Sequence, residues 1–325
     1  MRDRSEPWPS RVEQAHRDLV RVGHVDSIVA VSTPEGRFAV GDDSRRAEIG
    51  SVTKLFTSLL LTVLAEAGQV RLDDTVGTLL PAGTVLAPGL SAITLESLAC
   101  HRSGLPRLPP GMSPFRLRRP DLSDPYAAFD EAALLAALAR VRVRGVPGQA
   151  SPAYSNLGAG LLGYLLGRAA GTGFQDALTA RVLAPLGLDR TTTFSDENLR
   201  QGHHRGRPVG PWHLAALAGA GGLRAPAADL LTYLEAVRDG SGPLSGPIAE
   251  TLRPRNAGRV QFGLGWLILG DGDLLMHDGG TLGARCEVRV ERRSGTCVVV
   301  LGDARRGTAK AAMSLLDPKR PGSFR

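Results

Sequence analysis

Residues 50–68 read GSVTKLFTSLLLTVLAEAG, a strongly apolar stretch behind a short polar start. The pattern predicts a helix from about Ser51 to residue 67, because a glycine such as Gly68 is typical of the position just beyond a helix. Residues i and i+3 share a helix face, so the hydroxyl of Ser51 is expected one turn from the ammonium of Lys54. Burial would lower the lysine pKa and let Lys54 accept the serine proton. The alternative is an N-cap serine followed by an exposed lysine.

The basic residues make Lys54 more informative than an average lysine. Lys and Arg number 39 against 32 Asp and Glu, a net charge of +7, yet the only lysines are Lys54, Lys310 and Lys319. An arginine bias on a solvated surface accounts for this charge, and no aromatic residues are interleaved with the arginine clusters. The longest apolar stretch, residues 55–65, is too short to span a bilayer. We therefore expect neither a nucleic-acid partner nor a membrane partner.

Short β-like runs lie at both ends of the chain, and helical patterns occupy the middle. Periodicity predicts strands at residues 27–32, 37–40, 260–270, 274–277, 286–291 and 296–301. It predicts helices at residues 12–23, 94–100, 130–140, 157–170, 174–186, 227–238 and 304–316, with a surface loop at 107–125. The expected fold is therefore α/β of the α+β type, an antiparallel sheet formed by the N- and C-terminal segments and flanked by helices. Residues 1–70 and 256–325 would form the sheet-containing part and residues 71–255 a mainly helical part, with the active site at their interface.

A second candidate motif is Tyr154-Ser155-Asn156, which stands just before the helix expected near Leu157. Loop residues at such a position can point into a cleft. A tyrosine acts as a general base if nearby cations lower its pKa, and an asparagine amide can hold a substrate carbonyl or the lysine. The alternative is a turn with a packed Tyr154 and a capping Asn156.

The third candidate motif is His277-Asp278-Gly279-Gly280, where His277 ends a predicted strand and a glycine run follows. Glycines at such a point allow the backbone to approach a ligand closely. A second His-x-Gly begins at His204, but it is expected in an arginine-rich loop with no adjoining strand.

These three motifs occur in the order and rough spacing of the serine β-lactamase-like family, which the chain resembles over roughly residues 28–303. The family contains class C β-lactamases, D-Ala-D-Ala carboxypeptidases, penicillin-binding-protein-like esterases and some acyltransferases. The resemblance implies that Ser51 is the acylated nucleophile, that Lys54 and Tyr154 share the work of the base, and that Ser51 and Gly280 N–H groups form the oxyanion hole. It further implies a substrate-binding role for four residues, Asn156, His277, Gly279 and Gly280.

Other kinds of site have weaker support. The cysteines, Cys100, Cys286 and Cys297, show no CxxC spacing, and a buried structural role is expected for Cys100 rather than that of a thiol nucleophile. No carboxylate lies at ligand spacing from the three histidines His203, His204 and His213, so no metal is expected, and the acyl-serine chemistry requires no cofactor.

The sequence therefore favours a serine hydrolase or acyl-transfer enzyme that acts on a small-molecule ester or amide through a Ser51 acyl-enzyme. Two alternatives stay open: an acyltransferase in small-molecule biosynthesis, and a non-catalytic binding protein that keeps the fold. The N-terminal residues lack the apolar core of a secretion signal, which predicts a cytoplasmic location. The sequence leaves the oligomeric state open.

Overall fold

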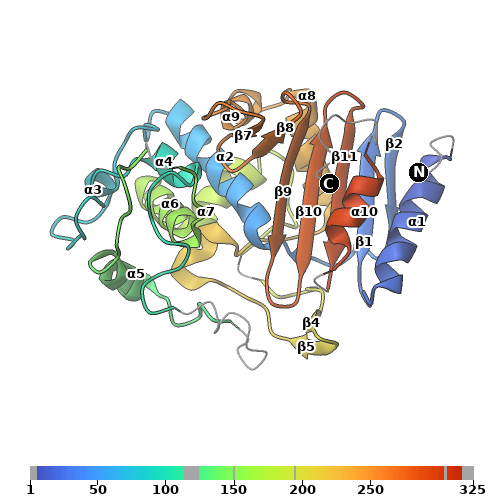
Figure 1. The fold of residues 1–325 in the computed structure, drawn as a ribbon, viewed down its shortest axis with the longest axis horizontal. Helices are drawn as coiled ribbons and strands as arrows, with labels where there is room; N and C mark the ends of the chain where they lie inside the picture. Colours follow the sequence, from blue (N-terminus) through green and yellow to red (C-terminus); the bar gives the residue numbers. More distant parts are fainter. Residues whose placement is uncertain (1–5, 113–123, 149–150, 194, 304–305, 317–325) are drawn as a thin grey trace.

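The two ends of the chain build one antiparallel sheet, with strand order β2-β1-β11-β10-β9-β8-β7 (Figure 1). The computed structural model describes residues 6–112, 124–148, 151–193, 195–303 and 306–316. The strands are β1 (Ile28–Thr33), β2 (Gly36–Val40), β7 (Val260–Phe262), β8 (Leu267–Leu269), β9 (Leu274–Gly280), β10 (Arg285–Glu291) and β11 (Thr296–Gly302). This arrangement confirms the predicted α+β fold with a sheet from both termini.

The central strands are buried on both faces because helices cover each side of the sheet. Side chains alternate along a strand, so Val298 and Val300 of β11 point to one face while Val299 and Leu301 point to the other. The first face packs against α1 (Trp8–Arg21) and α10 (Thr308–Ser314), which lie side by side over the sheet in Figure 1. The second face belongs to the main hydrophobic core.

Helix α2 (Thr53–Glu66) runs through this main core and is buried on almost every side, as its apolar sequence requires. It starts from the 3₁₀ turn η1 (Gly50–Val52), so the sheet side and the helical side of the molecule meet at its first residues. The other helices and helical turns are α3 (Val76–Leu79), α4 (Leu95–Ala99), α5 (Glu131–Leu138), α6 (Asn156–Ala169), α7 (Phe174–Leu178), η3 (Thr179–Leu183), η4 (Ala215–Ala220), α8 (Ala227–Asp239) and α9 (Ser245–Thr251). Two small strand pairs complete the fold, β3 (Ala47–Glu48) with β6 (Arg224–Ala225), and β4 (Gly202–His204) with β5 (Arg207–Val209).

Several boundaries differ from the predicted ones. The predicted strand 260–270 is two strands, because residues 263–266 turn the chain, with Gly265 at φ +77°. His204 is not in a strandless loop: it ends β4, whose hairpin with β5 turns through Arg205 and Gly206. Strand β9 continues past His277 through Gly280, so the third motif lies within a strand. Most of the predicted loop 107–125 and the start of the predicted helix 304–316 lie outside the described residues.

None of the helices in the described segments is both long and apolar enough to cross a bilayer. The division into residues 1–70 with 256–325 and residues 71–255 stays a prediction.

Candidate active site

Ser51 and Lys54 meet where η1 runs into α2. The Nζ atom of Lys54 lies 3.1 Å from Ser51 Oγ, 3.0 Å from Asn156 Oδ1 and 2.6 Å from the carbonyl oxygen of Ala220. Lys54 is only 2% exposed, whereas Ser51 is half-buried and reachable. The spacing predicted from the sequence is therefore realised, and the lysine is not the exposed one of the alternative interpretation.

Burial and a neighbouring cation change the protonation of Lys54. Removal from water, with the nearby Arg107 guanidinium acting in the same direction, lowers the pKa of Lys54 to about 7. An ammonium would donate to all three oxygens around Nζ. A neutral amine donates to two of them, the carbonyls of Ala220 and Asn156, and its lone pair is then left for the hydroxyl hydrogen of Ser51. The same geometry thus serves both protonation states.

Tyr154 and Asn156 reach the site from the start of α6. Ser155 is the N-cap, since its Oγ accepts the Gly158 N–H at 2.9 Å, so Asn156 is free to turn its side chain toward Lys54. The Tyr154 ring centroid lies 4.8 Å from Lys54 Nζ and 4.5 Å from the ring of His101. The second motif therefore joins the first, across about a hundred residues of sequence.

The tyrosine is a phenol rather than a phenolate at neutral pH. Burial raises the pKa of Tyr154 to about 12, although a hydrogen bond with Ser51 opposes this rise. The condition set from the sequence for a tyrosine base, that nearby cations lower its pKa, is not met, because burial outweighs the nearby Arg107 cation. Tyr154 can still pass a proton from its hydroxyl, but Lys54 is the group whose lone pair is available.

The backbone of β9 lies directly against the nucleophile turn. A Cβ atom on Gly279 would fall 2.0 Å from the Ile49 carbonyl oxygen and 2.8 Å from Ser51 N, so only glycine fits. A Cβ atom on Gly50, whose φ is +50°, would fall 2.3 Å from Gly280 N. The backbone N of Gly280 therefore lies close to the nucleophile turn, and the oxyanion hole formed by the Ser51 and Gly280 amides stays a prediction.

His277 lies on the same strand but carries no charge at neutral pH. Burial, and then the positive charge of Lys54, lower its pKa to about 4, and its Nδ1 lies 2.7 Å from the Asp278 carbonyl oxygen. An Nδ1–H donor to that carbonyl leaves Nε2 as an acceptor. The neighbouring His101 is neutral as well, since burial lowers its pKa to about 3. A substrate at this end of the site therefore meets two neutral imidazoles.

Three further residues contact the side chains of the site, although the sequence did not single them out. Tyr126 accepts a hydrogen bond from Asn156 Nδ2 at 3.4 Å, which directs the amide oxygen to Lys54. Ala220 contributes only its carbonyl, and η4 places it there. The exposed Arg107 guanidinium lies 5.1 Å from the Tyr154 ring centroid. The Ala220 carbonyl and the isolated Tyr126 belong to no sequence motif, so the sequence does not reveal them. Arg107 lies at the start of the predicted surface loop 107–125, which gave no reason to place it at the site.

The weaker candidates do not form sites of their own. Burial raises the pKa of Cys100 to about 12, so its thiol is a poor nucleophile. His203 Nδ1 pairs with Asp303 at 2.9 Å, while His213 lies beside Asp196 on another part of the surface. The described residues hold no group of three His, Cys, Asp or Glu side chains that could bind a metal ion.

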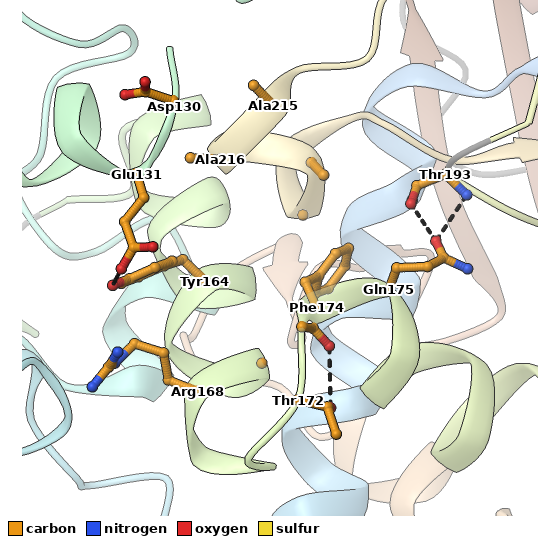
Figure 2. A pocket seen from close by; sticks show the side chains of 14 residues that line it. Asp130, Glu131, Tyr164, Arg168, Thr172, Phe174, Gln175, Thr193, Ala215 and Ala216 are labelled. Atoms are coloured by element: carbon orange, nitrogen blue, oxygen red, sulfur yellow. Dashed lines mark hydrogen bonds between the residues drawn. The ribbon is translucent and has the colours of Figure 1, made fainter.

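A separate cavity of about 540 Å³ lies between α6, α7 and η4 (Figure 2). Two pairs of its polar side chains are joined by hydrogen bonds: Tyr164 donates to Glu131, and Gln175 accepts from Thr193. None of the predicted site residues lines it. Figure 2 shows Phe174 and the small side chains of η4 around the space.

The sequence was then compared with those of known proteins. The model of the family described as Beta-lactamase matches residues 35–314, which include all three motifs. The chain belongs to this family. AmpH, the D-alanyl-D-alanine-carboxypeptidase/endopeptidase of Escherichia coli (strain K12), is 33% identical over 193 residues, which cover 58% of this chain and 47% of AmpH. Penicillin-binding protein 4 of Amycolatopsis lactamdurans is 27% identical over 281 residues, 78% of this chain and 70% of that protein. The chain thus spans about half the length of AmpH.

Solved structures with low sequence identity to this chain share its fold. A class C β-lactamase superposes with a TM-score of 0.79 at 17% identity and covers 99% of this chain and 100% of its own. The β-lactamase/D-alanine carboxypeptidase from Pseudomonas syringae gives a TM-score of 0.79 at 20% identity, over 96% and 99% of the two chains. These likenesses establish the fold.

Proposed function

We propose that this member of the Beta-lactamase family is a serine hydrolase that cleaves an ester or amide through an acyl-enzyme on Ser51. The observation that carries the proposal is the contact of 3.1 Å between Lys54 Nζ and Ser51 Oγ, made by a lysine whose pKa is lowered to about 7. A base next to a hydroxyl, with two backbone amides beside it, is the arrangement that acyl transfer to serine requires. The similarity to AmpH, a D-alanyl-D-alanine-carboxypeptidase/endopeptidase, and to Penicillin-binding protein 4 supports the same reaction class.

The residues divide the first half of the reaction between them. Neutral Lys54 takes the proton of Ser51 as Oγ bonds to the substrate carbonyl carbon, and the carbonyl oxygen becomes an oxyanion held by the Ser51 and Gly280 amides. When this intermediate collapses, the bond to the leaving group breaks and Tyr154 gives its phenolic proton to the departing atom. Tyr154 then recovers a proton from Lys54, which returns the lysine to its neutral form.

The second half releases the acyl group. Water attacks the ester carbonyl and loses a proton to the Lys54 and Tyr154 pair. As the bond between the carbonyl carbon and Ser51 Oγ breaks, the pair returns this proton to Oγ, which frees the carboxylic acid and restores Ser51. Asn156 keeps Lys54 in place throughout, because its amide oxygen accepts from Nζ. An alcohol or amine in place of water would make the chain an acyltransferase. Product analysis with and without added acceptor alcohols separates these outcomes, since hydrolysis yields only the acid.

Covalent labelling tests the proposal. A fluorophosphonate probe should add one label to the wild-type chain in intact mass spectrometry, and peptide mapping should place it on Ser51. Ser51→Ala should take up no label, while Ser91→Ala, which changes an exposed serine, should be labelled like the wild type. A label that persists in Ser51→Ala would refute the assignment. Absence of a label on the wild type across a panel of esters and β-lactams would favour a non-catalytic binding protein.

A further inference from the structure

A second, smaller cavity of about 160 Å³ opens beside Tyr154 and His277, on the sheet side of the site. Strands β7 to β9 and the end of α4 form its walls, and the proposed mechanism makes no use of it. The residues that line it include Cys100, Phe262, Trp266, Leu267 and Met276.

The walls of this cavity are apolar and, apart from the rim, uncharged. Trp266 is 1% exposed, and the Cys100 thiol is protonated and lies 3.9 Å from the Gly263 carbonyl oxygen. The two imidazoles that border it, His101 and His277, are neutral at pH 7. The one carboxylate among the lining residues, Asp278, is exposed at the rim, where it disfavours an anionic group. The space therefore suits an uncharged apolar group.

The position of Tyr154 indicates which part of a substrate would enter. In the tetrahedral intermediate the oxyanion points to the Ser51 and Gly280 amides, and the leaving atom must point to the proton donor. Tyr154 is that donor in the proposed mechanism, and its ring forms a wall of the cavity. A group attached to the leaving atom would therefore extend past Tyr154 and His277 into this cavity.

We propose that this cavity binds the alcohol or amine part of the substrate, and that it selects a small, uncharged, apolar leaving group. The inference rests on the proposed function, because it takes Tyr154 as the proton donor. At roughly 30 Å³ for the volume of one water, the cavity has room for about five non-hydrogen atoms. A four-carbon alcohol fits, and a linear eight-carbon alcohol extends beyond the walls.

Hydrolysis of methyl, ethyl, butyl and octyl acetate, followed as acid release in a pH-stat, tests the size selection. Burial of one methylene corresponds to about a fourfold gain, so kcat/KM should rise by about that factor per added carbon up to butyl and fall for octyl. The matched series of methyl acetate, butanoate and octanoate, in which the acyl group grows instead, should show no such maximum. A flat profile in the alcohol series, or a maximum in the acyl series alone, would overturn the proposal.

Substitutions at Leu267 and Leu269 locate the effect. Both residues lie on β8 and are half-buried, but only Leu267 lines the cavity. Leu267→Trp should reduce the ratio of butyl to methyl acetate kcat/KM to about one, and Leu267→Ala should move the maximum toward octyl. The same two changes at Leu269 should leave the wild-type profile in place. Unaltered profiles in the Leu267 variants would contradict the proposal.

The labelling experiment distinguishes failure of this inference from failure of the proposed function. If Ser51 takes up fluorophosphonate and none of the acetates is hydrolysed, the alcohol selectivity is wrong while the nucleophile assignment stands. If Ser51 is not labelled and none of the esters reacts, the proposed function itself fails.

Discussion

Lys54→Met should slow acylation of Ser51 by at least about 10²-fold at pH 8, as expected when a general base is removed. Methionine has similar length and no lone pair basic enough to accept the serine proton. The carbonyl of Ala220 and the amide oxygen of Asn156 would also lose their common donor. Stopped-flow measurement of the first turnover with an activated ester reports the acylation rate directly.

The same substitution at an exposed lysine provides the control. Lys310 is exposed on α10, on the far side of the sheet from α2, so Lys310→Met should acylate like the wild type. Circular dichroism at the same temperature checks that both variants are folded. Acylation by Lys54→Met within about threefold of the wild-type rate would show that Lys54 is not the base.

Tyr154→Phe should have a second large effect, and one that depends on the leaving group. For an alkyl alcohol, which must be protonated as it departs, we expect acylation to fall by about 10²- to 10⁴-fold. For p-nitrophenol, which departs as an anion, the loss should be about tenfold or less. The reason is that burial raises the pKa of Tyr154 to about 12, which suits a proton donor better than a base.

The ratio of the two rates separates this role from a general loss of structure. A disturbed site would slow both esters equally, whereas a missing proton donor slows the alkyl ester far more than the p-nitrophenyl ester. Tyr126→Phe is a suitable comparison, because Tyr126 contacts the site through Asn156 and does not face the leaving group. Equal losses for both esters in Tyr154→Phe would contradict the donor role.

The parts of the site that depend on local geometry were accessible from the sequence. Ser51 and Lys54 are one helical turn apart, so spacing alone predicts their contact. The scarcity of lysine added weight to Lys54, since Lys310 and Lys319 lie in the C-terminal segment. Sheet strands at both ends of the chain were predictable as well, because runs such as residues 296–301 are apolar and β-branched.

The remainder depends on long-range packing that no local pattern records. Tyr126 contacts Asn156 across 30 residues, and the Ala220 carbonyl reaches Lys54 across 166. The pKa of Tyr154 rises because the fold buries the phenol away from water. The sequence does not show how deeply a side chain is buried, so it does not predict this rise. The break at Gly265 inside the predicted strand 260–270 and the hairpin after His204 depend on the partner strands, so local sequence does not predict them. The predicted cytoplasmic location stays a prediction.

The claim that neutral Lys54 activates Ser51 is tested most directly by the acylation rate as a function of pH. The reaction needs the unprotonated amine, whose fraction rises with pH, so the rate should climb about tenfold per pH unit below a midpoint near 7 and then level off. Arg107→Ala should raise the midpoint, because the Arg107 cation helps to lower the Lys54 pKa. Burial raises the pKa of Glu48 to about 7 as well, so Glu48→Gln is the control and should keep the midpoint. A rate that is flat between pH 6 and 8, or a midpoint near the ordinary lysine value of about 10.4, would contradict the account.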